Sequence, residues 1–278
     1  MAERPSYGLL VSDIDGTLVG EDKVVPPGVV AAVKAARARG VRVCLATGRM
    51  WEAARPFVEV LGADPPVILF NGGLVYDFVS DRTLWARSLP RDIAAQILTV
   101  LPQFPQVSPL LFLRGKVFAL RRTPFVDLFA RRDRLPIHIA PAFTALLTED
   151  PMKFLIVGDR PDLEALSRAL ARLEEPPNQV FSQTDYLEIL PRDANKGVAL
   201  SILAEAVGTP IARTVAVGDN MNDVPLLQTA GLGIAVEGAP PELLAVAAWV
   251  CPPPEQEGLR VVVERVFLSG GLSAAGRQ

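Results

Sequence analysis

The sequence predicts an α/β protein with a Rossmann-like core, a mostly parallel sheet and an inserted α+β cap domain. Three observations lead to this prediction. Short apolar runs that read as buried strands alternate with helical segments near both ends of the chain. Hairpins mixed with helices interrupt this alternation in the middle of the chain. Several strand-like runs end in acidic, amide or glycine residues, and open parallel sheets bind their ligands at such strand ends.

The composition is that of an acidic globular protein with enough apolar residues for one large core or two smaller ones. The chain has 278 residues, of which 50% are hydrophobic, and a formal net charge of −3. No basic surplus favours nucleic acid, and no apolar run is long enough to span a bilayer, so neither partner is expected. Cys44 and Cys251 each lie in an apolar run, which is typical of buried thiols in a reducing cytoplasm.

The first third of the chain predicts strands that alternate with helices. A buried strand over residues 7–11 precedes a helix over 28–39, which begins after Pro26-Pro27 and ends at Gly40. The same alternation continues with a strand over 41–45, a helix over 50–61 and a strand over 67–70. A strand-helix-strand order predicts parallel neighbours joined by right-handed crossovers.

The middle of the chain has a different pattern. It begins with a predicted hairpin over residues 74–77 and 83–87. Further predicted elements are helices over 91–101, 125–131, 143–147 and 161–173, and strands over 109–113, 116–120, 137–139, 153–157, 179–182 and 186–190. We therefore expect residues 81–187 to form the inserted cap, and residues 1–80 and 188–278 to form the discontinuous core.

The alternation of strand and helix returns after the insert. The predicted elements are helices over 195–207, 242–248 and 259–267, strands over 214–217, 232–236 and 249–251, and a short helix that begins at Pro225. Glycine, serine and alanine dominate from Ser269 onward, and we expect that tail to be disordered.

Two carboxylates follow the first predicted strand. Asp13 and Asp15 are two positions apart, so an extended backbone points both side chains to the same side. Like charges this close repel unless a cation lies between them or one is protonated. A hard cation binds carboxylate oxygens, and a protonated aspartate can act as a general acid. Gly16 permits a sharp turn, and the Thr17 hydroxyl can pin the turn or touch a ligand. The alternative is an ordinary turn after a strand.

Polar residues also follow the next two predicted strands. Thr47, Gly48 and Arg49 combine a hydroxyl, outward-facing backbone N–H groups and a guanidinium, which together suit an anion. Asn71 and Gly72 come directly after the third strand and predict either a turn or an amide that faces a ligand at the same sheet edge. A polar loop with no ligand is the alternative in both places.

Two more clusters lie in the last third of the chain. Lys196 falls in the first turn of a predicted helix, where its charge opposes the helix dipole, so a nearby anion would explain its position. An exposed lysine is the alternative. Residues 218–223 place several acid and amide side chains between a strand and a helix, which favours an oxygen-rich cation site. The single histidine, His138, falls in a predicted strand, so a histidine-based triad or metal site is not expected.

Four motifs taken together resemble those of the haloacid dehalogenase superfamily. They are Asp13-Ile-Asp15-Gly-Thr17, Thr47-Gly-Arg49, Lys196-Gly and the run from Gly218-Asp219 to Asp223, in that order along the chain. Further details resemble its Cof-type sugar-phosphatase branch, namely Asn71-Gly-Gly, Met152-Lys-Phe-Leu-Ile and Leu187-Glu-Ile-Leu-Pro. The resemblance covers nearly the whole chain apart from its two ends, and it implies a cap inserted after the third core strand.

The resemblance also implies a role for each motif residue. Asp13 would be the nucleophile, Asp15 the general acid and then base, and Thr47 and Lys196 would hold the phosphoryl oxygens. The implied Mg²⁺ ligands are the Asp13 carboxylate, the Asp15 main-chain carbonyl and Asp219, completed or supported by Asn222 and Asp223. The residues implied to face the substrate are Thr47, Gly48, Arg49, Asn71, Gly72 and Lys196. Asn220 departs from the family's usual small residue, and we expect it to adjust the loop without abolishing metal binding.

The expected function is therefore that of a cytoplasmic, Mg²⁺-dependent phosphatase for small phosphomonoesters, such as sugar phosphates, acting as a monomer or small homo-oligomer. One alternative is a dedicated phosphatase for a sugar derivative of osmolyte synthesis, or a phosphosugar mutase. A second is a non-catalytic regulator that resembles a receiver domain and is phosphorylated on an aspartate. Asp15 argues against the regulator, because a signalling domain has no use for an acid that speeds loss of its phosphate.

Overall fold

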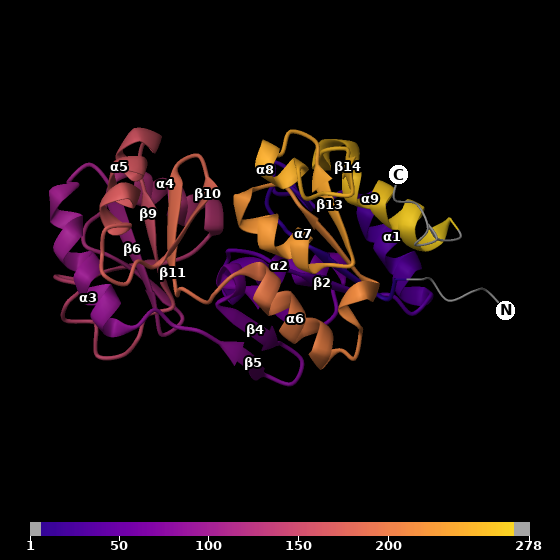
Figure 1. The fold of residues 1–278 in the computed structure, drawn as a ribbon, viewed down its shortest axis with the longest axis horizontal. Helices are drawn as coiled ribbons and strands as arrows, with labels where there is room; N and C mark the ends of the chain where they lie inside the picture. Colours follow the sequence, from indigo (N-terminus) through magenta and orange to yellow (C-terminus); the bar gives the residue numbers. More distant parts are fainter. Residues whose placement is uncertain (1–6, 270–278) are drawn as a thin grey trace. The chain divides into compact units, whose positions relative to one another are not determined.

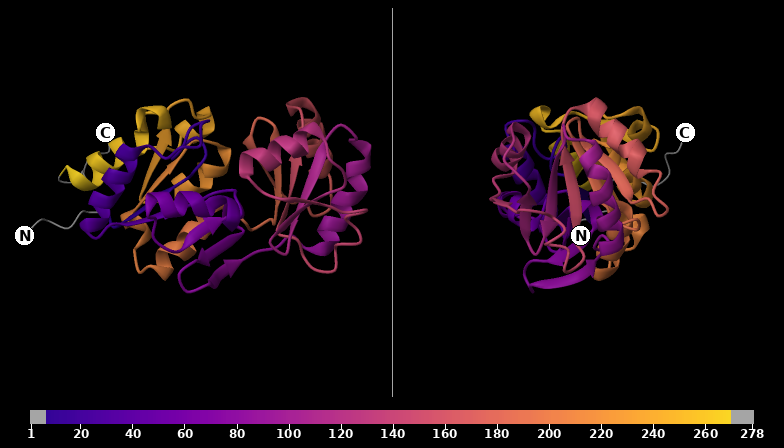
Figure 2. Two further views of the ribbon diagram at one scale, coloured as in Figure 1. Left: turned by 180° about the vertical axis from the view of Figure 1, so that it is seen from behind. Right: turned by 90° about the vertical axis from the view of Figure 1, so that its left-hand side faces the viewer.

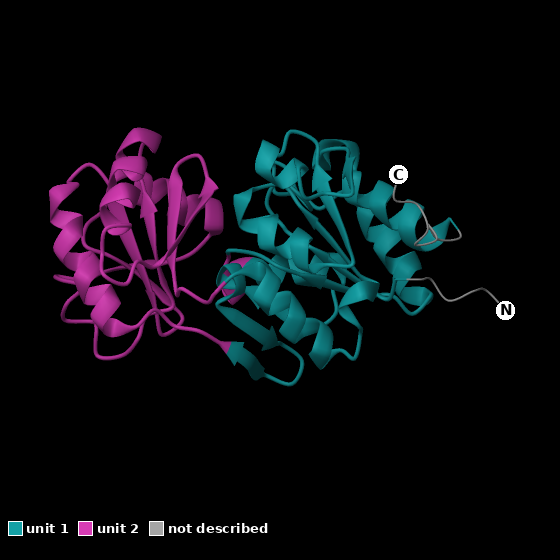
Figure 3. Cartoon of the chain, viewed as in Figure 1, with its two compact units in different colours: residues 1–48, 54–85, 195–278 teal, residues 49–53, 86–194 magenta. Residues whose placement is uncertain are grey.

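A computed structural model of the chain describes residues 7–269, and it divides into two compact units (Figure 3). Unit 1 comprises residues 1–48, 54–85 and 195–278, and unit 2 comprises residues 49–53 and 86–194. The chain thus leaves unit 1 after residue 85 and returns at residue 195, a few residues later than the sequence-based borders after 80 and after 187. No helix among residues 7–269 is long and apolar enough to cross a membrane.

Unit 1 is built on a parallel sheet of five strands in the order β14-β13-β12-β1-β2. Figure 1 labels β2, β13 and β14 of this sheet. The strands are β1 (Leu9–Ser12), β2 (Arg42–Leu45), β12 (Thr214–Gly218), β13 (Leu232–Val236) and β14 (Trp249–Cys251). In the register of β1, Leu9 lies opposite Thr214 on one side and Arg42 on the other. The carboxyl ends of β1 and β12 are therefore neighbours, which brings the segments after Ser12 and after Gly218 together.

Helices cover this sheet and supply its core. They are α1 (Pro27–Ala38), α2 (Trp51–Leu61), α6 (Lys196–Ala206), α7 (Val224–Thr229), α8 (Pro241–Leu244) and α9 (Gly258–Val263). Leu9 and Val11 of β1 pack in one buried cluster with Leu200 and Leu203 of α6 and Leu226 of α7. Helices α1 and α9 lie side by side, as seen both in Figure 1 and from behind in the left view of Figure 2. Burial on both faces explains why these strands read as continuous apolar runs.

A smaller sheet of three strands completes unit 1. It has the order β3-β4-β5, formed by Val67–Leu69, Leu74–Asp77 and Arg82–Ala86. A parallel bridge between Ala46 and Ile68 joins it to the end of β2. A short 3₁₀ turn, η1 (Phe70–Gly72), connects β3 to β4, so the predicted hairpin pairs with the third core strand.

Unit 2 contains a sheet of six strands in the order β10-β11-β9-β6-β7-β8, mostly antiparallel. Its strands are β6 (Ser108–Leu113), β7 (Lys116–Ala119), β8 (Ile137–Ile139), β9 (Lys153–Val157), β10 (Asn178–Gln183) and β11 (Tyr186–Leu190). Its helices are α3 (Arg91–Val100), α4 (Pro124–Asp133) and α5 (Arg160–Leu170), and a 3₁₀ turn, η2 (Leu101–Gln103), follows α3. Phe154 and Ile156 of β9 pack with Ile97 of α3 and Leu166 of α5 in one core cluster.

Three predicted elements differ from the structure. The helix expected over 143–147 is wrong: this segment forms turns that place Phe143 in the core of unit 2, and it is too short to sustain a helix by itself. The helix expected over 242–248 ends at Leu244, because the backbone N–H of Ala248 already donates to Gly233 of the neighbouring strand. The last helix changes after Val263 into a π-helical turn, η6 (Glu264–Leu268). The predicted disordered tail lies outside the described residues except for Ser269.

Short 3₁₀ segments connect the remaining elements of unit 1. They are η3 (Ile211–Arg213), η4 (Met221–Asp223) and η5 (Pro254–Gln256). Of these, η4 lies between β12 and α7 and carries Asn222 and Asp223 of the predicted cation site.

Candidate active site

Asp13 stands where strand β1 ends, between β12 and β2. Its backbone N–H donates to Val217 of β12 at 3.0 Å, and its carbonyl accepts the Ser12 hydroxyl at 2.7 Å, so the backbone is held on both sides. Gly16 has a φ of +82°, and a Cβ at this position would lie 2.2 Å from Oδ2 of Asp219. The turn after Asp13 therefore needs glycine both for its conformation and for the close approach of Asp219.

Lys196 lies at the start of α6 and is fully buried. Its Nζ donates to Oδ1 of Asp13 at 2.7 Å and to Oδ1 of Asp223 at 2.6 Å. The Asn195 side chain caps the helix by accepting the N–H groups of Gly197 and Val198. Two carboxylates thus supply the anionic surroundings that a lysine at a helix N-terminus requires.

The carboxylates of this cluster carry more negative charge than one lysine balances. Burial raises the pKa of Asp13 to about 7, although Lys196 opposes this shift, and the charges of Asp223 and Asp15 raise it further. Burial and the neighbouring Asp13 also raise the pKa of Asp219 well above its usual value. Burial alone would lower the pKa of Lys196, but the charges of Asp13 and Asp223 outweigh it and leave the pKa above its ordinary value.

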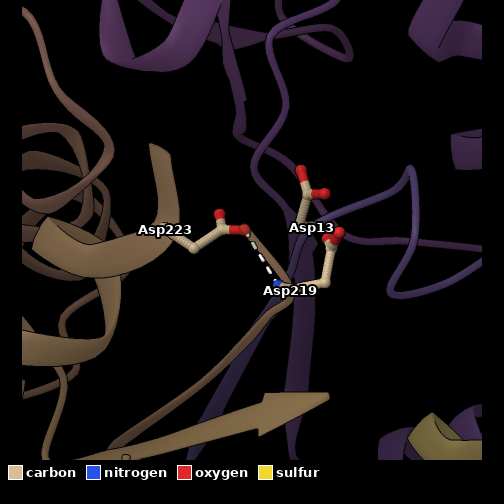
Figure 4. Close-up of side chains that lie close together, drawn as sticks. All are labelled: Asp13, Asp219 and Asp223. Carbon is tan, nitrogen blue, oxygen red and sulfur yellow. Dashed lines mark hydrogen bonds between the residues drawn. The ribbon is translucent and has the colours of Figure 1, made fainter. Parts of the chain in front are cut away.

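The arrangement of these acids fits a hard cation. One carboxylate oxygen from each of Asp13, Asp219 and Asp223 lies within 4.8 Å of the other two. Figure 4 shows these three side chains close together. The Thr17 hydroxyl donates to Oδ1 of Asp219 at 2.8 Å, which holds that side chain in place. An all-oxygen, carboxylate-rich donor set with a surplus of negative charge is the kind of site that Mg²⁺ prefers.

Asp223 also organises the loop that carries Asp219. Its Oδ2 accepts the backbone N–H of Asp219 at 3.1 Å, which Figure 4 marks with a dashed line. The same oxygen accepts the backbone N–H of Asn220 at 3.2 Å. Gly218 permits this, because a Cβ there would lie 2.4 Å from the Cβ of Asp223. Asn220 accepts the backbone N–H of Met221 at 2.8 Å and caps the short turn η4. The asparagine that departs from the usual small residue is therefore a local cap.

The tips of β2 and β3 meet beside α6. The backbone N–H of Asn71 donates to the carbonyl of Thr47 at 2.9 Å. A Cβ on Gly72 would lie 2.2 Å from the carbonyl oxygen of Asn195, so this turn packs directly against the residue before Lys196. Asn222 donates from Nδ2 to Oδ1 of Asn71 at 3.0 Å, which links this turn to the loop after β12.

Two of the predicted residues make other contacts. The Asp15 carboxylate accepts a hydrogen bond from Lys23 Nζ at 2.7 Å, an ion pair that the sequence analysis missed because no motif marks Lys23. Arg49 belongs to unit 2, where its Nη1 donates to Oδ1 of Asp133 at 2.9 Å. The structure thus brings Asp13, Lys196, Asp219 and Asp223 together within unit 1.

Comparison with known sequences matches the chain along most of its length. The profile of one protein family, haloacid dehalogenase-like hydrolase, matches residues 10–263. An HMP-PP phosphatase of Serratia proteamaculans is 32% identical, with 85% of this chain and 86% of that protein covered. A pyridoxal phosphate phosphatase of Escherichia coli is 29% identical, with 83% of this chain and 88% of that protein covered.

Solved structures agree with this result. A haloacid dehalogenase-like hydrolase from Bacteroides thetaiotaomicron superposes with a TM-score of 0.84 at 25% identity, covering 94% of this chain and all of that one. The X-ray structure of a Thermotoga maritima protein superposes with a TM-score of 0.80 at 24% identity, which shows the shared fold. The predicted α/β fold with its inserted domain is thereby confirmed.

Proposed function

Because this chain belongs to the haloacid dehalogenase-like hydrolases and is a phosphoric monoester hydrolase, we propose that it hydrolyses small phosphorylated metabolites through a phosphoaspartate at Asp13. The observation that carries this proposal is Lys196, which is buried between Asp13 and Asp223 with Asp219 close by. A buried ammonium that contacts a carboxylate at a strand end is positioned to receive an anionic substrate.

The first half of the proposed reaction transfers the phosphoryl group to Asp13. An Asp13 oxygen attacks phosphorus, the ester P–O bond breaks, and the protonated Asp15 gives its proton to the leaving oxygen. Lys196 Nζ offsets the repulsion between the Asp13 carboxylate and the substrate, and it stabilises the charge of the transition state. The Asp13 N–H donates to the Val217 carbonyl and the Asp13 carbonyl accepts the Ser12 hydroxyl, and these bonds keep Asp13 in place as the new bond forms.

The second half releases inorganic phosphate. Asp15, now ionised, takes a proton from water, whose oxygen attacks phosphorus as the bond to Asp13 breaks. Lys23 contacts the Asp15 carboxylate and so holds it in place for this step. The proposed Mg²⁺ ligands are Asp13, Asp15 through its main-chain carbonyl, and Asp219. A cation bound there supplies charge that neutralises the phosphoryl oxygens and the acids.

Removal of divalent metal is expected to abolish hydrolysis of p-nitrophenyl phosphate, because the acids of the site would repel the substrate. Activity should return with added Mg²⁺. Mg²⁺ should also raise the melting temperature, since it would bind only the folded arrangement of Asp13 and Asp219. The control is Asp219→Asn, which should blunt the shift in melting temperature. Full activity after exhaustive chelation would contradict the proposed site.

Asp15→Asn is expected to slow turnover by at least about a hundredfold, the usual scale of a lost general acid or base. Because p-nitrophenolate leaves readily without a proton, Asp13 should still be phosphorylated, whereas water would lack its base. Mass spectrometry of the acid-quenched variant should therefore detect one added phosphoryl group, which wild type turns over too quickly to accumulate. A variant with wild-type turnover and no such adduct would count against this role.

The substrate class is tested by a screen that measures kcat/KM for many phosphorylated metabolites. The set should include HMP-PP, pyridoxal phosphate and several sugar phosphates. Comparable activity on several compounds would support a broad phosphatase, whereas a strong preference for one sugar derivative would support the dedicated enzyme. A phosphosugar mutase would yield positional isomers of its substrate without releasing stoichiometric inorganic phosphate. If wild type hydrolyses none of them and p-nitrophenyl phosphate is also stable, the proposal fails.

A further inference from the structure

An amide pair in unit 1 has hydrogen-bonding capacity that the described residues do not use. Asn222 Nδ2 donates to Asn71 Oδ1 at 3.0 Å, across 151 positions of the chain. Two atoms remain, Asn71 Nδ2 and Asn222 Oδ1, and both are buried without a hydrogen-bond partner among residues 7–269. A buried N–H donor without a partner is costly, so the Asn71 Nδ2 indicates a ligand that offers it an acceptor.

The backbone around Asn71 is held in one place. Phe70 and Asn71 have φ values of 51° and 55°, in the left-handed region that side-chain-bearing residues rarely adopt. The hydrogen bond from Asn71 N–H to Thr47 and the close packing of Gly72 against Asn195 maintain this conformation. Strained turns of this kind cluster at functional sites. With the backbone fixed, the Asn71 amide can still adopt two orientations, which exchange the positions of its oxygen and its nitrogen.

The contact with Asn222 goes with one of these two orientations. In the structure the Asn222 Nδ2 donates to the oxygen of Asn71, and the Asn71 nitrogen points elsewhere. The nitrogen lies next to Gly48, where an added Cβ would come within 2.9 Å of it. The unpartnered donor is thus presented beside the Thr47-Gly48 tip, and a donor there matches an anionic oxygen.

We propose that Asn222 is a positioning residue, and that it orients the Asn71 amide so that Nδ2 donates to an oxygen of a bound phosphoryl group. This inference rests on the proposed phosphatase function. It assigns Asn222 to substrate orientation and not to the Mg²⁺ shell, where the family resemblance would place it. Asn71 is 2% exposed, so its amide is shielded from bulk water and its hydrogen bond to the anion is strong.

The test measures binding of inorganic phosphate in saturating Mg²⁺ by calorimetry, which does not depend on turnover. Asn71→Ala and Asn222→Ala should each weaken phosphate about five- to tenfold, the effect of one lost hydrogen bond. The double variant should bind no more weakly than Asn71→Ala alone, because both changes remove the same contact. Gln228→Ala, which removes an exposed amide from α7, is the matched control and should leave phosphate affinity unchanged.

The two roles of Asn222 are separated by titration with Mg²⁺. A positioning residue predicts that Asn222→Ala leaves the Mg²⁺ affinity unchanged, and that Asn222→Asp does not tighten it. A metal ligand predicts weaker Mg²⁺ binding in the alanine variant, tighter binding in the aspartate variant, or both, and any of these would overturn the inference. Additive losses of phosphate affinity would also overturn it. Failure of wild type to hydrolyse phosphomonoesters would reject the proposed function separately, because these binding measurements remain readable.

Discussion

Asp13→Asn is expected to remove phosphatase activity by at least about a thousandfold, on the scale measured for loss of a nucleophile in other enzymes. The carboxamide cannot attack phosphorus, so the phosphoaspartate cannot form. The effect should appear in kcat, because Lys196 remains to bind the substrate. The measurement is steady-state hydrolysis of p-nitrophenyl phosphate, together with mass spectrometry to show that no phosphorylated protein forms.

The fold should survive this change. Asparagine has nearly the shape of aspartate, its oxygen can still accept the Lys196 hydrogen bond, and Asp223 keeps the ammonium paired. Asp22→Asn is the matched control, because Asp22 is an exposed acid of the same segment that accepts a backbone N–H two residues on. It should retain wild-type rates. Near wild-type turnover by the Asp13 variant would reject Asp13 as the nucleophile.

Lys196→Met is expected to cause the second large effect, on both activity and stability. Methionine fills much of the same volume but leaves Asp13 and Asp223 facing each other without a cation. Loss of one partner from a buried ion pair typically costs about 3–5 kcal/mol of unfolding free energy. Activity should fall by at least about a hundredfold, because the charge that stabilises the transition state is gone. Denaturant unfolding and steady-state kinetics measure the two effects.

The stability of this variant should depend on Mg²⁺ more strongly than that of wild type. A cation at the acids would replace part of the charge that Lys196 supplied, and unfolding free energy should therefore recover partly as Mg²⁺ is added. Lys153→Met is the matched control, because Lys153 is a buried lysine of unit 2 that pairs with Glu188 at 2.5 Å. It should lose stability without regaining it in Mg²⁺. Equal responses of both variants would show that the acids of the site do not hold the cation.

The sequence predicted the fold class and most elements because the signals for them are local. Continuous apolar runs mark β1, β2, β12 and β13, since parallel strands are buried on both faces. The position of Lys196 in a first helical turn, against the helix dipole, indicated a nearby anion, and two carboxylates contact it. The helix predicted over 143–147 was wrong, because the burial of Phe143 decides the conformation of this segment and burial is not a local property.

The partners of individual side chains could not be predicted in this way. Asp223 belonged to a predicted cation site, yet its Oδ1 contacts Lys196 and its Oδ2 accepts two backbone N–H groups. Asn71 and Asn222 belong to two separate polar segments of the sequence. Their spacing along the chain does not indicate the hydrogen bond between their side chains. Lys23 lies in none of the sequence motifs, although its side chain donates a hydrogen bond to Asp15.

The sequence by itself thus determined the order of strands and helices, the family, and the polar residues that follow β1, β2, β3 and β12. Only the tertiary structure decided which of those residues contact each other, and which atom of each contact is the donor and which the acceptor. Apolar periodicity and strand order are carried by residues close along the chain, whereas a hydrogen bond between positions 71 and 222 depends on how two turns pack. The direction of each amide and carboxylate follows from its neighbours in space, which no local pattern encodes.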